Sequence, residues 1–215
     1  MLEEWLGPIT IDAFVSQQLQ RVPIAQPSSI GNPEALLDWG RLDRVLASDA
    51  GDTLVVSRGE LLPFPQPRGL LELRAYMRDG IGLCIRHAER CDPVLARIAA
   101  QFERDIGTSM VQLFVTPRAT HGFGWHFDDE DVFIAQTAGV KDYYFRPNTV
   151  TVGPADSTKF AAFSRETSQL HTATLHPGDF LYIPARWWHM ALCRETSLSV
   201  SVGVFPAAQR GSANT

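Results

Sequence analysis

The chain of 215 residues is long enough for one well-buried domain with a short annex and too short for two large domains. Hydrophobic residues make up 45% and charged residues 20%, which excludes disordered and fibrous classes. The net charge of −5 argues against a general affinity for nucleic acid, which needs a basic surface.

The cysteines and the N-terminus indicate a cytoplasmic protein. Cys84, Cys91 and Cys193 form no CxxC pair, so we expect three ordinary thiols in a reducing compartment. The acidic start over 1–8 lacks the basic region and apolar core of a signal peptide. No apolar run is long enough to span a bilayer, so we expect no membrane partner.

Residues 1–109 are expected to form a helical and mixed lead-in that packs on the rest of the fold. Asn32 is a candidate N-cap, and Asp92 is another, for a helix that Gly107 ends. A short strand is expected over 54–56. Apolar periodicity and these caps predict helices at 12–19, from Pro33 onward, at 70–79 and at 93–106.

Residues 110–206 differ in character, because short β-branched and aromatic runs are interrupted by Gly and Pro. Short strands at close spacing predict a sandwich or barrel, a class that includes the jelly-roll cupins. Residues 207–215 are expected to be a tail. The predicted strands are 110–116, 124–127, 131–137, 142–146, 169–175, 180–183, 189–193 and 197–205.

A candidate metal site begins at His126 and Asp128. Residues two apart in a strand face the same side, so these two side chains would aim a nitrogen and an oxygen at one point. His189, 63 residues later, is the best candidate for a third ligand from a neighbouring strand. Two histidines and one carboxylate form the facial triad that favours non-haem iron(II). Taken alone, the His126 pair is more often a core histidine beside a turn aspartate.

Lys141 is a lone basic residue in a segment after Gly139 that we expect to be an apolar β-hairpin. A buried ammonium needs an anionic partner, because an unpaired charge in apolar surroundings is costly. The alternative is a solvated lysine in a turn.

Four stretches of the second part carry a family resemblance: 115–117, 122–141, 175–189 and 197–203. Together they resemble the JmjC oxygenases, and within them the cupin-like ribosomal-oxygenase branch. The resemblance is strong over 110–206 and looser over 1–100. It implies a mainly β fold, the double-stranded β-helix of the jelly-roll cupins, and an oxygenase that depends on Fe(II) and 2-oxoglutarate. His126, Asp128 and His189 match the iron ligands of that family.

The resemblance also assigns residues to the cosubstrate. Lys141 matches the basic residue that binds the distal carboxylate of 2-oxoglutarate, and Thr116 and Ser199 fall where the family places polar groups near it. Phe114 stands where relatives often carry a tyrosine, so one hydroxyl contact is expected to be missing. The branch continues into a dimerisation region and a winged-helix domain beyond the point where this sequence ends. Dimerisation and ribosomal-protein recognition are therefore left open.

The leading hypothesis is a hydroxylase that uses dioxygen and 2-oxoglutarate on an amino-acid side chain in a protein or peptide. The first alternative is hydroxylation of a small molecule, such as a free or carrier-bound amino acid. A non-catalytic cupin binding module and a metal-dependent isomerase are further alternatives. A homodimer through a sheet edge or the N-terminal helices is also left open.

Several other residues are interpreted more simply. The charge run 129–131 is expected to be a solvated turn, and His121 a loop histidine; in both cases a contact with the substrate is the alternative. Tyr143 and Phe145 share strand parity with Lys141 and are candidates for the wall of the cosubstrate site. Trp188 is expected to pack and so to fix the approach of His189.

Overall fold

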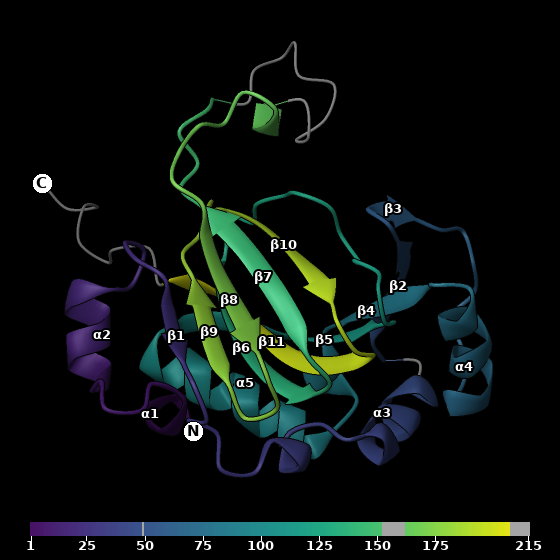
Figure 1. Ribbon diagram of the computed structural model, residues 1–215. Coiled ribbons are helices and arrows are strands. Elements are labelled where there is room, and N and C mark those ends of the chain that lie inside the picture. The colour runs from purple at the N-terminus through teal and green to yellow at the C-terminus, as the bar shows by residue number, and fades with distance from the viewer. Residues whose placement is uncertain (49, 152–161, 207–215) are drawn as a thin grey trace, which may run out of the picture.

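Two antiparallel sheets that lie face to face form the body of the protein (Figure 1). The computed structural model describes residues 1–48, 50–151 and 162–206. The larger sheet has the order β1-β9-β6-β11-β5-β4-β2-β3, and the smaller sheet has the order β10-β7-β8. This arrangement is a mainly β, cupin-like jelly roll with helices, so the predicted fold class is confirmed.

The strands of the larger sheet are β1 (Ile24–Gln26), β2 (Asp52–Ser57), β3 (Glu60–Leu61), β4 (Gly82–Arg86), β5 (Gly107–Thr116), β6 (Asp131–Ala138), β9 (Phe180–Ile183) and β11 (Ser197–Pro206). Those of the smaller sheet are β7 (Lys141–Arg146), β8 (His171–Leu175) and β10 (Trp188–Cys193). The helices are α1 (Leu2–Trp5), α2 (Ile11–Gln17), η1 (Pro33–Ala35), α3 (Trp39–Leu46), α4 (Leu70–Arg78), η2 (Ala88–Arg90) and α5 (Pro93–Asp105).

The two faces of the larger sheet have different partners because side chains alternate along each strand. On β5 and β11, Val111, Leu113, Val200 and Val202 belong to the main core, which includes residues of α5 such as Phe102. Figure 1 shows α5 on one side of this sheet and the smaller sheet on the other. The opposite residues of β5 and β11 are therefore turned toward the space between the sheets.

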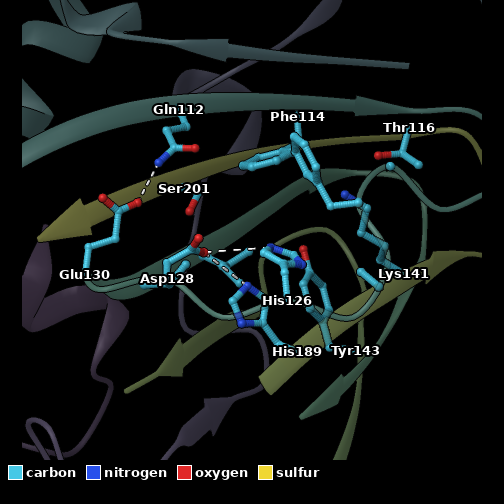
Figure 2. A pocket seen from close by; sticks show the side chains of 15 residues that line it. Gln112, Phe114, Thr116, His126, Asp128, Glu130, Lys141, Tyr143, His189 and Ser201 are labelled. Carbon is cyan, nitrogen blue, oxygen red and sulfur yellow. Dashed lines mark hydrogen bonds and ion pairs between the residues drawn. The ribbon is translucent and has the colours of Figure 1, made fainter. Parts of the chain in front are cut away.

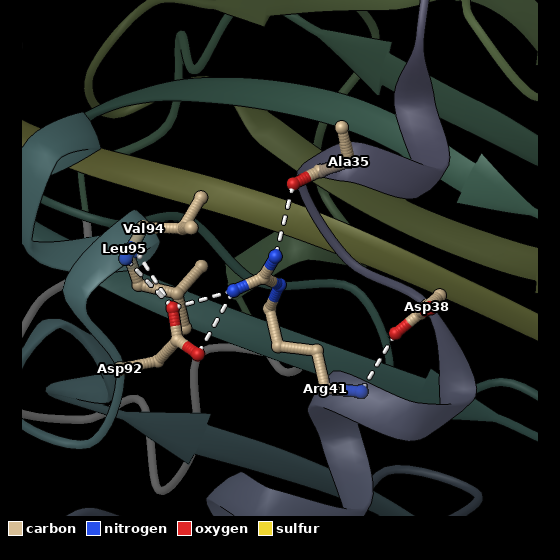
Figure 3. A network of polar contacts seen from close by, with 6 residues as sticks. All are labelled: Ala35, Asp38, Arg41, Asp92, Val94 and Leu95. Atoms are coloured by element: carbon tan, nitrogen blue, oxygen red, sulfur yellow. Dashed lines mark hydrogen bonds and ion pairs between the residues drawn. The ribbon is translucent and has the colours of Figure 1, made fainter.

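A polar network joins the starts of two helices (Figure 3). Asp92 caps α5 by accepting from Val94 N at 2.7 Å, and the same carboxylate receives two hydrogen bonds from Arg41 Nη1 of α3, at 2.7 and 2.9 Å. Asp38 caps α3 by accepting from Arg41 N at 2.6 Å. The predicted cap at Asp92 is thus confirmed, and it also ties α3 to α5.

The predicted helices are present, with one change at Pro33. Asn32 Oδ1 accepts from Ala35 N at 3.2 Å, as an N-cap does, but the helix it begins is the short 3₁₀ helix η1. Asp38 then starts a separate helix, α3, because its carboxylate supplies a second cap. Gly107, predicted to end a helix, follows directly after α5 and is the first residue of β5.

Two predictions about strands are wrong. Residues 124–127 form no strand, and His126 makes only an isolated β-bridge with His189. The predicted hairpin around Gly139 is absent too, since β6 pairs with β9 and β11 while β7 pairs with β8 and β10. The chain therefore crosses from one sheet to the other at Gly139, whose φ of +68° suits such a sharp change of direction.

The boundary near residue 109 remains a prediction, although β2 and β4 of the first part extend the larger sheet. The predicted tail, 207–215, lies outside the described residues. Among the helices of the described residues, none is long and apolar enough to cross a membrane.

Candidate functional site

Two histidines far apart in the sequence are locked together by their backbones. His189 N donates to His126 O at 2.8 Å, and His126 N donates to His189 O at 3.2 Å. His189 lies on β10, and His126 lies in the connection from β5 to β6. Their ring centroids are 4.3 Å apart. This isolated bridge positions His126, whereas the sequence had predicted that a strand over 124–127 would do so.

The same backbone sets the direction of each ring. His126 Nδ1 lies 2.7 Å from Gly124 O, and His189 Nδ1 lies 3.0 Å from Trp187 O. A carbonyl oxygen only accepts, so both Nδ1 atoms carry the proton and each Nε2 presents a lone pair. This is the arrangement by which proteins orient histidine ligands of metals.

Both Nε2 atoms point at the carboxylate of Asp128 (Figure 2). Asp128 Oδ2 lies 3.7 Å from His126 Nε2 and 3.4 Å from His189 Nε2. The three residues each offer one ligand atom, and these atoms all lie within 4.8 Å of one another. The structure therefore brings the three predicted ligand residues together in a geometry that can hold a metal ion.

The loops that carry the triad are fixed by neighbouring elements. Asp128 O accepts from Arg186 N at 2.7 Å, which joins the loop before β6 to the loop before β10. On the other side, Gly59 N at the β2–β3 turn donates to Gly122 O at 2.7 Å. Trp188 is fully buried and packs edge-on against Phe127, at 4.9 Å between centroids. The packing role predicted for Trp188 is confirmed.

A pocket opens beside the triad, between the two sheets. Its empty space is about 620 Å³, including the open mouth. Both sheets contribute to the wall. The lining residues are Gln112, Phe114, Thr116, Gly122, Phe123, His126, Asp128, Glu130, Val132, Ile134, Lys141, Tyr143, His189, Ala191 and Ser201.

Lys141 places a cation in this pocket. Its side chain is 3% exposed, and its Nζ lies 3.5 Å from Ser199 Oγ and 5.7 Å from the centre of the Phe114 ring. Among the described residues, no carboxylate forms an ion pair with it. An unpaired buried ammonium is costly, and an anionic ligand in the pocket would supply the missing counter-charge. The alternative of a solvated turn lysine is wrong.

The remaining cosubstrate candidates lie near Lys141 in different ways. Thr116 is among the residues that line the pocket. Ser199 is fully buried and is not among them, whereas Ser201, two residues further along β11, does line the pocket. Tyr143 also lines the pocket, and burial raises the pKa of its phenol, which therefore stays protonated. Phe145 belongs to the small core between the sheets and is not among the lining residues.

Glu130 is a pocket residue that the sequence reasoning missed. The predicted solvated turn over 129–131 is wrong for Glu130 and Asp131, which are 7% and 0% exposed. Burial, together with the charge of Asp128, raises the pKa of Glu130 to about 7. The available signal was parity: Glu130, Val132 and Ile134 alternate along the start of β6, and all three line the pocket.

Comparison with known proteins places this geometry in a family. The family model described as "JmjC domain" matches residues 85–211, more than half of the chain. The chain belongs to the JmjC domain family. The JmjC domain of this protein contains the whole triad, the pocket and most of the two sheets.

Named relatives of this JmjC domain include ribosomal oxygenases. Ribosomal oxygenase 2 of Mus musculus is 32% identical over 154 residues, which are 71% of this chain and 32% of that protein. The "bifunctional lysine-specific demethylase and histidyl-hydroxylase NO66" of Drosophila persimilis is 28% identical over 102 residues, 47% of this chain and 15% of that protein. The chain therefore spans less than a third of the length of these curated relatives.

Solved structures share the fold. The ribosomal oxygenase YcfD from Escherichia coli, in complex with cobalt and succinic acid, superposes with a TM-score of 0.67 at 18% identity and covers 94% of this chain and 53% of its own. Its complex with cobalt and 2-oxoglutarate gives 0.66 at 19% identity, with the same coverage. At this identity the likeness establishes the architecture of the JmjC domain alone.

Proposed function

We propose that the protein is an Fe(II)- and 2-oxoglutarate-dependent oxygenase that hydroxylates an amino-acid side chain in a protein or peptide. One observation carries this proposal: two histidine Nε2 atoms and the Asp128 carboxylate converge beside a buried lysine that has no carboxylate partner among the described residues. The names of the relatives support the same reading, since they are oxygenases of proteins.

The residues fit iron(II). Two imidazoles and one carboxylate on one side of an ion leave the other coordination positions open, as non-haem iron oxygenases require. The carbonyls of Gly124 and Trp187 accept from Nδ1 of His126 and His189, which leaves each Nε2 directed at the ion, so binding needs no change of tautomer. Bound iron would supply the oxidation of a C–H bond by dioxygen, with 2-oxoglutarate as the source of two electrons.

The other end of the pocket fits 2-oxoglutarate. Lys141 would pair with the distal carboxylate, while Ser199 holds the ammonium in place through its hydroxyl. The protonated phenol of Tyr143 and the hydroxyl of Thr116 add polar groups from the two facing sheets. Val132 and Ile134 add apolar side chains to the lining, which help to exclude water.

We also propose that the protein is located in the cytoplasm. The structure has free thiols at Cys84, Cys91 and Cys193, as expected in a reducing cytoplasm. Turnover assays with a protein, a peptide and a free amino acid distinguish between these three kinds of substrate.

Anaerobic calorimetry and a turnover assay test the oxygenase activity. The purified protein with Fe(II) should bind 2-oxoglutarate and, once air and ascorbate are added, should release succinate. His126→Ala should abolish metal-dependent turnover, because it removes one of three ligands. His176→Ala, which changes an exposed histidine, is the matched control. A wild-type protein that neither binds 2-oxoglutarate nor forms succinate would contradict the proposal.

A further inference from the structure

The pocket has a second polar end, opposite in charge to the first. Figure 2 shows Lys141 and Thr116 at one end and Glu130 and Gln112 at the other, with the triad between them. All of these residues line the same pocket. If the lysine end receives the cosubstrate, as proposed above, the glutamate end is the part of the pocket that remains for the substrate.

The glutamate end is built into the sheet. Gln112 Nε2 of β5 donates to Glu130 Oε1 at 2.7 Å, across the strand β11 that separates them. The carboxylate occupies the space above Gly203 of β11: a Cβ there would lie 2.3 Å from Glu130 Oε1. A glycine at this position thus makes room for a buried carboxylate.

The side chain of Gln112 is itself oriented by a residue of the neighbouring strand β4. The Cys84 thiol of β4 lies 3.6 Å from Gln112 Oε1, and burial raises the pKa of this thiol to about 12, so it remains a donor. The thiol therefore holds the amide oxygen, and the amide Nε2 faces Glu130. A hydrogen-bond chain of three residues from three elements fixes the position of the carboxylate.

The carboxylate has capacity left for a ligand. Within the part of the chain that the structure describes, its hydrogen bond comes from Gln112 and reaches Oε1. Arg86, whose charge lowers the pKa of Glu130, forms an ion pair with Asp52. Glu130 Oε2 is therefore the atom that can accept from a substrate.

We propose that Glu130, held by Gln112, determines specificity by accepting from the cationic end of the substrate side chain. The inference rests on the proposed function. In the loaded site, the formal charges of a metal dication, Asp128, a dicarboxylate cosubstrate and Lys141 cancel, so the carboxylate of Glu130 is left without a formal counter-charge, and a cationic partner would favour its ionised form. A cation on the substrate balances that charge, and an anionic substrate is repelled.

Pairs of ligands that differ only in charge test this inference. Gly-Gly-Arg-Gly-Gly is compared with the same peptide containing citrulline, which replaces the guanidinium by a neutral group of equal shape. A second pair contains lysine and acetyllysine. Free arginine and citrulline form a parallel arm, which distinguishes a peptide from a free amino acid as the source of the cation. Each is titrated anaerobically into the protein loaded with Fe(II) and 2-oxoglutarate, with binding measured by calorimetry.

The wild type should bind at least one cationic member about tenfold or more tightly than its neutral partner, as a charge-assisted hydrogen bond to a buried carboxylate implies. Glu130→Gln keeps the shape and should reduce that ratio to within about twofold. Glu103→Gln, an exposed glutamate on α5, is the matched control and should keep the ratio. Thermal unfolding of each variant shows that it is folded.

Equal binding of the charged and neutral members, no binding of any of them, or a preference that survives in Glu130→Gln would overturn the inference. These outcomes are separate from a failure of the oxygenase proposal, which would appear earlier as absent 2-oxoglutarate binding by the wild type.

Discussion

Lys141 is a charged residue placed by its strand among aromatic rings. Its Nζ lies 5.7 Å from the centre of Phe114 and 5.9 Å from the centre of Tyr143, so two rings cover the ammonium. Phe114 has no hydroxyl to offer a ligand, but Tyr143 brings one to the same pocket from the smaller sheet, which faces it. The polar contact expected to be missing at Phe114 is therefore available from another strand.

Replacing Lys141 should weaken the binding of 2-oxoglutarate. Lys141→Ala removes a charge-assisted hydrogen bond, for which roughly 1.5–3 kcal/mol or about 10- to 100-fold in Kd is expected. Lys141→Arg keeps the charge and should recover part of the affinity. Calorimetry of the Fe(II)-loaded protein measures both. An unchanged Kd in Lys141→Ala would show that the lysine does not bind the cosubstrate.

Motifs and parity made different residues predictable. The ligand candidates and Lys141 could be predicted because each has a fixed spacing within a motif, and the structure places all four at one pocket. Glu130 was not predicted as a pocket residue, because a run of three acidic residues is typical of a solvated turn and this outweighed its parity with Val132 and Ile134. Only the position of Gly203 on a distant strand reveals the space for its carboxylate.

Two connections determine how the elements place the site. The connection at Gly139 carries the chain from the larger to the smaller sheet, which puts Lys141 opposite β5 and β11. The bridge between His126 and His189 brings two of the proposed metal ligands together from distant parts of the chain. Local patterns predicted most strands but neither connection, because partner choice depends on packing between distant segments. That is why 124–127 was predicted as a strand and β6–β7 as a hairpin.

Gly139→Ala should destabilise the fold. The residue has φ +68°, and an added Cβ would lie 2.2 Å from Thr196 O, so both the backbone and its neighbour must shift. We expect a loss of about 2 kcal/mol or more in the free energy of unfolding. Gly40→Ala, on α3, meets only ordinary contacts and should change stability little or raise it. Urea unfolding measures both, and equal midpoints for the two variants would refute the argument.

Among the described residues between β7 and β8, which are 147–151 and 162–170, the carboxylate of Glu166 accepts hydrogen bonds that join the two parts. Burial alone would raise its pKa, but hydrogen bonds from Thr149 and Ser168 outweigh burial and lower the pKa to about 2. An unfolded glutamate titrates near 4.3, so the folded group binds its proton more weakly. Its stabilising effect is therefore full above about pH 4.5 and is lost as the pH falls toward 2.

Glu166→Gln tests this effect. The variant should lose about 1–2 kcal/mol at pH 7, because it replaces charge-assisted hydrogen bonds by neutral ones. The difference from the wild type should shrink as the pH falls from 4.5 to 2. Chemical unfolding at a series of pH values measures it. A difference that stays constant over that range would mean that Glu166 does not titrate with folding.

At the scale of the whole molecule, the larger sheet has one face in the hydrophobic core and the other at the candidate site. One face packs against the helices in the main core, and the other face lines the pocket. Alternation along β5 and β11 separates the two faces, whereas the pairing order of the sheets could not be predicted from the sequence. The pocket has walls from both sheets, so a ligand bound there connects them.

Metal and cosubstrate together should therefore raise the unfolding temperature of the entire domain. The triad joins the loop before β6 to β10, and Lys141 adds β7, so a bound ion and dicarboxylate would hold both sheets in the folded arrangement. At a ligand concentration of 100 times Kd, about 2.7 kcal/mol of stabilisation is expected. Differential scanning fluorimetry with Mn(II) as a redox-inert ion and 2-oxoglutarate measures the shift. His126→Ala should lose most of it and His176→Ala should keep it, because only the first removes a ligand. Stabilisation of equal size in both variants would place the binding elsewhere in the molecule.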